Sequence, residues 1–153
     1  MIEVKFEGVE KLSKRLETIE SDLKKKGGRF ALRKAANLVR DDAKRRAREV
    51  NNTASKESIA DNIAVRWSTR RFKRTGDLMF RVGVLGGARQ GSGNDGNPGG
   101  DTFHWRFVEF GSEHNNPARP FMRPALSENI DKVIAEFVQQ YDRALDRALR
   151  KVT

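Results

Sequence analysis

Hydrophobic residues recur at intervals of three and four along two stretches near the start of the chain, a spacing typical of amphipathic helices. In the first stretch the apolar positions are Val9, Leu12, Leu16, Ile19 and Leu23. In the second they are Leu32, Ala35, Ala36, Val39, Ala43 and Ala47. Between the two stretches stand Gly27 and Gly28, a pair that commonly ends a helix. We therefore predict helices over about residues 9–26 and 29–50, the second with a face of small side chains that another element can approach closely.

A third helical pattern occupies the last part of the chain. Ser127 and Glu128 offer an N-cap followed by early acidic charge. The apolar positions after them share one helical face: Ile130, Val133, Ile134, Phe137, Tyr141, Ala144, Leu145 and Ala148. These positions predict a helix over about residues 125–150.

Alternation of apolar and polar residues marks four short segments that we interpret as strands. They are residues 2–6, 63–67, a segment around Met79, Val82 and Val84, and 103–110. The predicted fold is therefore α+β, with the three helices packed on a small, mainly antiparallel sheet of about four strands. At 153 residues the chain fits a single domain over residues 1–153.

Residues 86–102 contain more than half of the chain's thirteen glycines, and this composition predicts a flexible loop. The loop lacks the Lys-Ser/Thr pair of a phosphate-binding P-loop. We interpret it as a surface loop.

Composition narrows the classes of function. The chain has 31 Lys and Arg against 21 Asp and Glu, a formal charge of +10, and no cysteine. Disulfides and thiolate metal sites are therefore excluded. The N-terminal residues show no apolar signal region and no apolar run approaches a membrane span, so we expect a soluble chain that is made in the cytoplasm and used without export or membrane contact.

The basic residues gather in two places. Four of them form a stripe on the second predicted helix: Arg29, Arg33, Arg40 and Lys44. Four more follow Trp67 and surround Phe72: Arg70, Arg71, Lys73 and Arg74. Cations interleaved with aromatic rings are found in single-strand binders, but the same residues also suit an acidic protein partner or a solvated surface. The pattern alone leaves these three interpretations open.

Residues of catalytic type are sparse. His104, Glu109 and His114 are spaced by five, which on a strand places His104 and Glu109 on opposite faces. We therefore predict no metal site, and with two histidines and no cysteine we predict no catalytic triad and no cofactor. The acidic pairs Asp41-Asp42 and Asp142/Asp146 are interpreted as ordinary helix charges.

The segment from residue 103 to 126 is the most distinctive part of the sequence. Aromatic residues lead to Glu109-Phe110-Gly111, and three prolines then stiffen residues 117–124. We expect Glu109 to pair with Arg119 or Arg123, which would fix the turn at Gly111. Aromatic and Arg side chains on a stiff segment are typical of interfaces. The candidate interface residues are Phe107, Glu109, Phe110, Gly111, Arg119, Pro120, Phe121, Arg123 and Pro124.

The runs Arg106–Ser112 and Pro117–Leu126 resemble the signature of a phage head–tail joining family, the tail-completion proteins of long-tailed, non-contractile phages. These proteins are similar in role to the minor tail protein Z of phage lambda. The resemblance implies an α+β fold, no enzymatic activity and a ring, usually of six subunits, at the neck of the virion. It also implies two neighbours for that ring: the head connector on the portal side and the tail terminator or tail tube. The long glycine-rich loop over residues 86–102 departs from the family pattern.

The principal alternative is a stand-alone nucleic-acid-binding module that uses the second helix and residues 67–74. If the chain instead forms a ring, DNA passes through it, and a strongly basic wall would hold that DNA. We therefore favour acidic protein neighbours over DNA as the partner of most of the basic charge.

Overall fold

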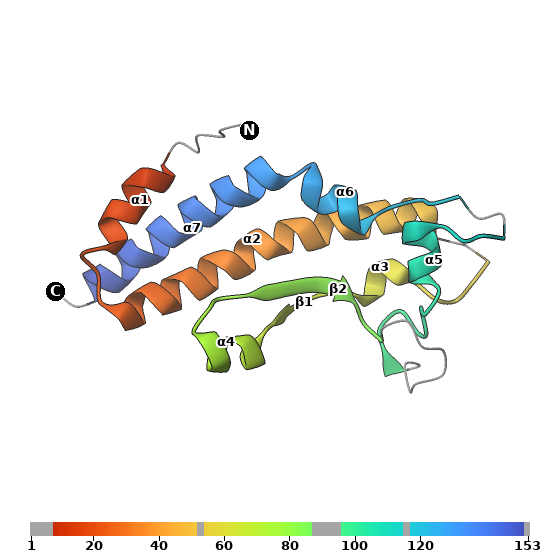
Figure 1. Ribbon diagram of the computed structural model, residues 1–153, viewed down its shortest axis with the longest axis horizontal. Helices are drawn as coiled ribbons and strands as arrows, with labels where there is room; N and C mark the ends of the chain where they lie inside the picture. The colour runs from red at the N-terminus through yellow and green to blue at the C-terminus, as the bar shows by residue number, and fades with distance from the viewer. Residues whose placement is uncertain (1–7, 52–53, 87–95, 115–116, 152–153) are drawn as a thin grey trace. The chain divides into compact units, whose positions relative to one another are not determined.

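The computed structural model describes residues 8–51, 54–86, 96–114 and 117–151, and it shows an α+β protein (Figure 1). The helices are α1 (Val9–Leu16), α2 (Ser21–Val50), α3 (Ile59–Asn62), α4 (Thr69–Thr75), α5 (Trp105–Phe110), α6 (Met122–Ser127) and α7 (Ile130–Arg150). The strands are β1 (Ile63–Trp67) and β2 (Phe80–Val84), which pair antiparallel.

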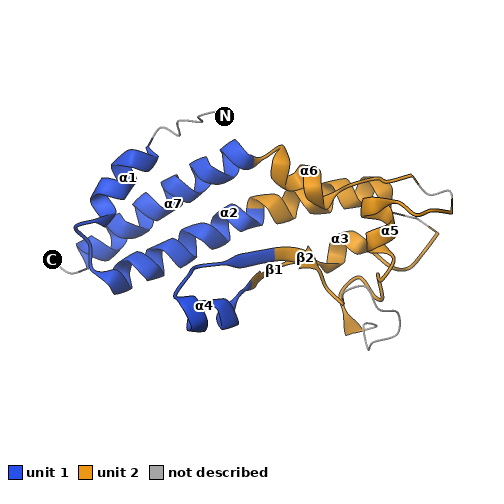
Figure 2. Ribbon diagram, in the orientation of Figure 1, with its two compact units in different colours: residues 1–37, 67–81, 130–153 blue, residues 38–66, 82–129 orange. Residues whose placement is uncertain are grey.

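The chain divides into two compact units, drawn in different colours in Figure 2. Unit 1 comprises residues 1–37, 67–81 and 130–153, and unit 2 comprises residues 38–66 and 82–129. The long helix α2 contributes its first part to unit 1 and its second part to unit 2.

Unit 1 is built around α1, the first part of α2, and α7. Its buried cluster consists of Leu12, Ala31, Tyr141 and Leu145, with Leu16, Ile19, Phe137 and Val138 packed against it. Arg15 on α1 forms ion pairs with both Asp142 and Asp146 on α7. The predicted apolar faces of the first and last helices therefore do form a core.

The predicted end of a helix at Gly27 and Gly28 is wrong, because both glycines lie inside α2, and the boundary falls between Leu16 and Ser21 instead. The Tyr141 ring takes the space that side chains would fill: a Cβ at Gly27 would lie 3.0 Å from Tyr141 Cε2. The Tyr141 hydroxyl also donates a hydrogen bond to the Lys24 carbonyl oxygen at 2.6 Å. The glycines thus serve close helix packing rather than helix termination.

The two central strands lie where alternation predicted them. Ser68 N–H donates to the Met79 carbonyl and Leu85 N–H to the Asn62 carbonyl, which sets the antiparallel register. The connection between the strands holds helix α4, which the sequence analysis did not anticipate. Trp67 anchors this helix, because its ring packs against Phe72 and Phe80 at 5.3 and 5.1 Å between centroids.

In unit 2 the second part of α2 presents a row of buried small residues to its neighbours. The buried apolar residues of this unit are Val39, Ala43, Ala47, Ile59, Ala60, Ile63, Phe121 and Ala125. With Ala31 and Ala35 in unit 1, the buried positions of α2 follow a spacing of four. This burial agrees with the prediction that the small side chains of α2 allow another element to approach its backbone closely.

A second buried feature of unit 2 is the amide of Asn62, which is fully buried. Its oxygen accepts from Gly99 N–H at 2.7 Å, and its nitrogen donates to the Gly100 carbonyl and to Thr102 Oγ1. Ser58 N–H donates to the Gly99 carbonyl at 2.8 Å. These bonds hold the described end of the glycine-rich segment against α3, whereas residues 87–95 of the predicted loop lie outside the described residues.

Three further predictions about helices and strands are either wrong or concern residues that the structure does not describe. The predicted strand over 103–110 is wrong: residues 105–110 form helix α5. The predicted last helix is two helices, α6 and α7, separated at Glu128 and Asn129, where the Asn129 amide donates to the Ala125 carbonyl and to Asp42. The described residues therefore contain a two-stranded sheet rather than four strands, and the predicted strand over 2–6 lies outside them.

Candidate protein interface

The Glu109 side chain organises the segment that the sequence analysis singled out. Its carboxylate is buried, with 1% of the residue exposed. Oε2 accepts hydrogen bonds from the backbone N–H groups of Phe121 and Met122 at 2.8 and 2.9 Å. Oε1 accepts from the backbone N–H and from Nε of Arg123 at 3.0 and 3.1 Å. The carboxylate of α5 thus caps the first turn of α6, whose backbone N–H groups have no partner within the helix.

We call this arrangement the Glu109 clasp: the Glu109 carboxylate, the N–H groups of residues 121–123 and the Arg123 guanidinium. Arg123 also donates from Nη2 to the Glu109 carbonyl at 2.8 Å. The guanidinium therefore binds both the side chain and the backbone of Glu109. The ion pair that the sequence predicted for Glu109 therefore forms with Arg123. Arg119 contributes through its backbone N–H, which donates to the Val108 carbonyl at 2.8 Å.

The clasp changes the acidity of Glu109. Burial raises the pKa of this carboxyl, but the three backbone N–H groups and the Arg123 side chain favour the ionised form more strongly. The net result is a pKa below the ordinary value of 4.5. Glu109 is therefore a carboxylate at neutral pH and has no proton to donate.

The clasp places two phenylalanines of α5 in solvent. Phe107 is 53% exposed and Phe110 is 59% exposed, while Leu126, one turn beyond Arg123 on α6, is 53% exposed. The Arg123 guanidinium lies 4.8 Å from the centre of the Phe110 ring, which connects the exposed residues of the two helices. We call the exposed side chains Phe107, Phe110, Arg119, Arg123 and Leu126 the α5–α6 face.

Phe121 does not belong to this face, because its side chain is fully buried. It is the largest fully buried side chain among the described residues, and with Ala125 it belongs to the packed interior of unit 2. Phe121 was predicted to be an interface residue, but because it is buried it anchors the segment from the inside. Gly111 and Pro124 are half-buried, and Pro120 is exposed beside Arg119.

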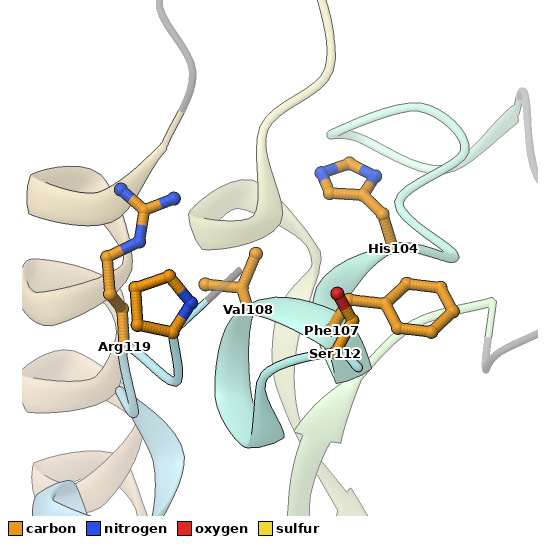
Figure 3. A pocket seen from close by; sticks show the side chains of 6 residues that line it. His104, Phe107, Val108, Ser112 and Arg119 are labelled. Atoms are coloured by element: carbon orange, nitrogen blue, oxygen red, sulfur yellow. The ribbon is translucent and has the colours of Figure 1, made fainter. Parts of the chain in front are cut away.

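Beside the α5–α6 face is a cavity of about 420 Å³, shown in Figure 3. Its lining consists of His104, Phe107, Val108, Ser112, Pro117 and Arg119. In the view of Figure 3, Arg119 and Phe107 lie on opposite sides with Val108 between them. A hollow with apolar walls and a cation at its edge suits an apolar side chain of a partner.

The residues of the two predicted basic groups are distributed over both units. Arg29, Arg33, Arg70, Arg71, Lys73 and Arg74 belong to unit 1, whereas Arg40 and Lys44 belong to unit 2. Arg40 pairs with its neighbour Asp41, and Arg71 pairs with Asp77. Arg29 lies 4.2 Å from the centre of the Trp67 ring.

The acidic residues considered for catalysis have structural partners. Asp42 binds Arg45, Arg46 and Asn129, and these bonds hold its pKa below the ordinary value against the opposing effect of burial. In the parts of the chain that the structure describes, no three His, Cys, Asp or Glu side chains gather as a metal site would require. Nor does any helix there have the length and apolar character to cross a membrane.

Sequence reasoning missed two contributors to this region. Leu126 is absent from the predicted interface residues, although it is 53% exposed and its spacing of three from Arg123 places the two on the same side of α6. The buried amide of Asn62 gave no periodic signal, since its hydrogen-bond partners lie 37 to 40 residues away. Only the folded chain brings such partners together.

One protein family matches the chain over residues 10–111, about two thirds of its length: the HK97-gp10-like family, described as "Bacteriophage HK97-gp10, putative tail-component". The chain belongs to this family of bacteriophage tail components. The matched residues include Glu109 and end before the segment that supplies its hydrogen-bond donors. Neither the curated proteins nor the solved structures contain a match to the chain.

The family confirms the phage origin inferred from the resemblance. A phage tail component is a structural protein of the virion and acts through contacts with other virion proteins.

Proposed function

We propose that this tail component joins the DNA-filled head to the tail, as one subunit of a ring between the head connector and the tail terminator or tail tube. The observation that carries the proposal is the α5–α6 face, which presents aromatic and Arg side chains on a segment fixed by the Glu109 clasp. Membership in a phage tail family supports the same role. The protein acts in this role by binding and not by catalysis.

The composition of the α5–α6 face fits protein–protein contact. Aromatic and Arg residues are enriched at interfaces and dominate their binding energy. Phe107, Phe110 and Leu126 each leave about half or more of their surface in solvent. Burying such side chains against a partner contributes about 25 cal/mol for each Å² of apolar surface removed from water.

The rigidity of the face matters as much as its composition. Association costs free energy when mobile side chains and loops must be ordered. Here the clasp, the backbone bond from Arg119 to Val108 and the prolines of residues 117–124 order the segment before any partner arrives. A ring closes when one such face meets a different surface of the next subunit, because a head-to-tail contact repeats around an axis.

The joining role is tested by electron microscopy of a lysate from a phage with a stop codon in this gene. We expect DNA-filled heads beside complete but unattached tails. Normal infectious particles would refute any essential role, and absent or abnormally long tails would move the protein from joining to an earlier step of tail assembly.

The contact itself is tested by supplying that phage with the double variant Phe107→Ala and Phe110→Ala. Both rings are exposed, so we expect the variant to fold with its stability changed by less than about 1 kcal/mol. We expect it to restore few attached tails. The matched control is Leu149→Ala, a 40% exposed apolar residue of α7, which should restore attachment. Full restoration by the double variant would refute the α5–α6 face as a contact.

A further inference from the structure

The positive charge of the chain is concentrated in one of its two units. Unit 1 has 20 Lys and Arg and 11 Asp and Glu, a formal charge of +9, whereas unit 2 has 11 and 10, a formal charge of +1. The candidate protein interface lies in unit 2. The charge of +10 on the whole chain therefore belongs almost entirely to a region that the proposed contact does not use.

Within unit 1, exposed cations from two helices form a basic face. Its members are Lys25, Arg29 and Arg33 on α2 and Arg70, Lys73 and Arg74 on α4. The α2 residues follow one another at intervals of four, which aligns them on one side of the helix. Contacts between the two elements bring the groups together: Arg29 lies over Trp67, next to the start of α4, and Leu78, after α4, lies against Gly28.

These six side chains have no acidic partner within the part of the chain that the structure describes. Among the residues that the structure describes, none of the six forms an ion pair, whereas neighbouring Arg71 is paired with Asp77. Their charge is therefore available to a ligand outside the chain. An array of six unneutralised cations attracts polyanions over a distance of about a Debye length.

The basic face lacks the apolar anchors of a protein interface. All residues of 21–37 and 67–81 are described, and none of their large apolar side chains is among the exposed ones. Stable protein contacts bury an apolar or aromatic centre surrounded by polar residues. A face made of exposed Lys and Arg without apolar side chains suits a ligand that binds through electrostatic attraction. The phosphate backbone of nucleic acid is such a ligand. This composition argues against the acidic protein partner favoured from the sequence.

The aromatic residues of the same region are occupied. Trp67 is covered by Arg29 and packs against Phe72 and Phe80. Single-strand binders stack bases on free aromatic rings, and no aromatic side chain of the described residues 21–37 and 67–81 is among the exposed ones. We propose that the basic face of unit 1 binds the phosphate backbone of duplex DNA without reading its bases.

The proposal stands on the surface itself and not on the joining role, so the two can fail separately. The test is fluorescence anisotropy of a labelled 30-base-pair duplex of arbitrary sequence with the full-length protein, at NaCl concentrations from 50 to 200 mM. If the six cations each contact a phosphate, log K falls with log [NaCl] at a slope of about −5. Affinity then drops by about a thousandfold over this range. A slope close to zero, or no binding at 50 mM, would overturn the proposal.

A pair of triple variants locates the site. Arg70→Gln, Lys73→Gln and Arg74→Gln together should reduce the magnitude of the slope by about 3. The control removes the same charge from unit 2 with Lys44→Gln, Arg48→Gln and Lys56→Gln, and it should keep the slope of the unchanged protein. Equal losses in both variants would mean that binding follows net charge alone, which would refute a site on unit 1.

Two competitors distinguish the ligand class. Poly-L-glutamate at equal charge should displace the duplex poorly, and a single-stranded oligonucleotide should bind no more tightly than the duplex. Efficient displacement by polyglutamate would replace the proposal with an acidic protein partner. Tight single-strand binding that resists salt would show base stacking, in conflict with the covered Trp67 ring.

Discussion

Replacing Glu109 by glutamine tests whether the clasp holds the α5–α6 region together. The substitution preserves the size of the side chain and exchanges one carboxylate oxygen for an NH2 group. Each oxygen of Glu109 accepts from two donors. In either orientation the glutamine amide therefore loses two hydrogen bonds and directs its own N–H groups at donors.

The magnitude follows from which pair is lost. The Arg123 side chain is 58% exposed, so water can replace the bond to its Nε, and the glutamine oxygen should remain on Phe121 and Met122. The backbone N–H of Arg123 is then left facing an NH2 group. An unsatisfied buried donor costs about 1–3 kcal/mol, and loss of the buried ionic partner brings the total to about 2–4 kcal/mol.

The assay is thermal and urea unfolding of the free protein, followed by circular dichroism. A loss of 3 kcal/mol lowers Tm by about 6–12 °C for a chain of this length. The matched control is Glu113→Gln, which makes the same charge change at an exposed position four residues away and should stay within about 0.5 kcal/mol. A Glu109→Gln stability within 0.5 kcal/mol of the unchanged protein would refute the clasp.

The clasp also predicts a pH dependence with a definite sign. Because folding lowers the pKa of Glu109, the unfolded chain binds more protons at pH values just below 4.5, and stability rises with pH there. The contribution of Glu109 is complete above the unfolded pKa and is lost as pH falls through the folded pKa. The stability difference between the unchanged protein and Glu109→Gln should therefore shrink below about pH 4.5. A difference that is constant from pH 7 to pH 3 would contradict this.

Two more stability predictions concern close packing. Gly99→Ala places a Cβ 1.9 Å from the Ser58 carbonyl oxygen, so we expect a loss of about 3 kcal/mol or more by urea unfolding; Gly96→Ala, with nothing within 4 Å, is the control and should be nearly neutral. Equal stability of the two variants would show that the Gly99 contact is absent. Tyr141→Phe removes the hydrogen bond to the Lys24 carbonyl and should cost about 1 kcal/mol; an unchanged Tm would mean that this bond contributes nothing.

Much of the helical core could be predicted because periodicity reports which face of an element is buried. The buried stripe of α2 and the buried Tyr141 and Leu145 of α7 lie on the predicted faces. The strands β1 and β2 followed from alternation in the same way. In these elements local pattern and tertiary packing agree.

The failures occur where tertiary contacts override local signals. Gly27 and Gly28 resemble a helix end, but the Tyr141 ring, more than 110 residues away, makes them packing positions. Residues 105–110 have the aromatic composition of a strand, yet they form a helix that buries Glu109 and exposes Phe107 and Phe110. For the interface itself, the sequence narrowed the partner of Glu109 to Arg119 or Arg123, but it did not show that Phe121 is an internal anchor. Burial of a single aromatic residue has no signature in a non-periodic segment.

The Glu109 clasp has a consequence for the order of events during synthesis. All four of its hydrogen-bond donors lie 12 to 14 residues after Glu109 in the chain. While the ribosome has not yet released residues 121–123, the carboxylate has no partner and α5 has no fixed attachment to α6. The clasp, and with it the attachment of α5 to α6, can therefore form only after residues 121–123 have left the ribosome.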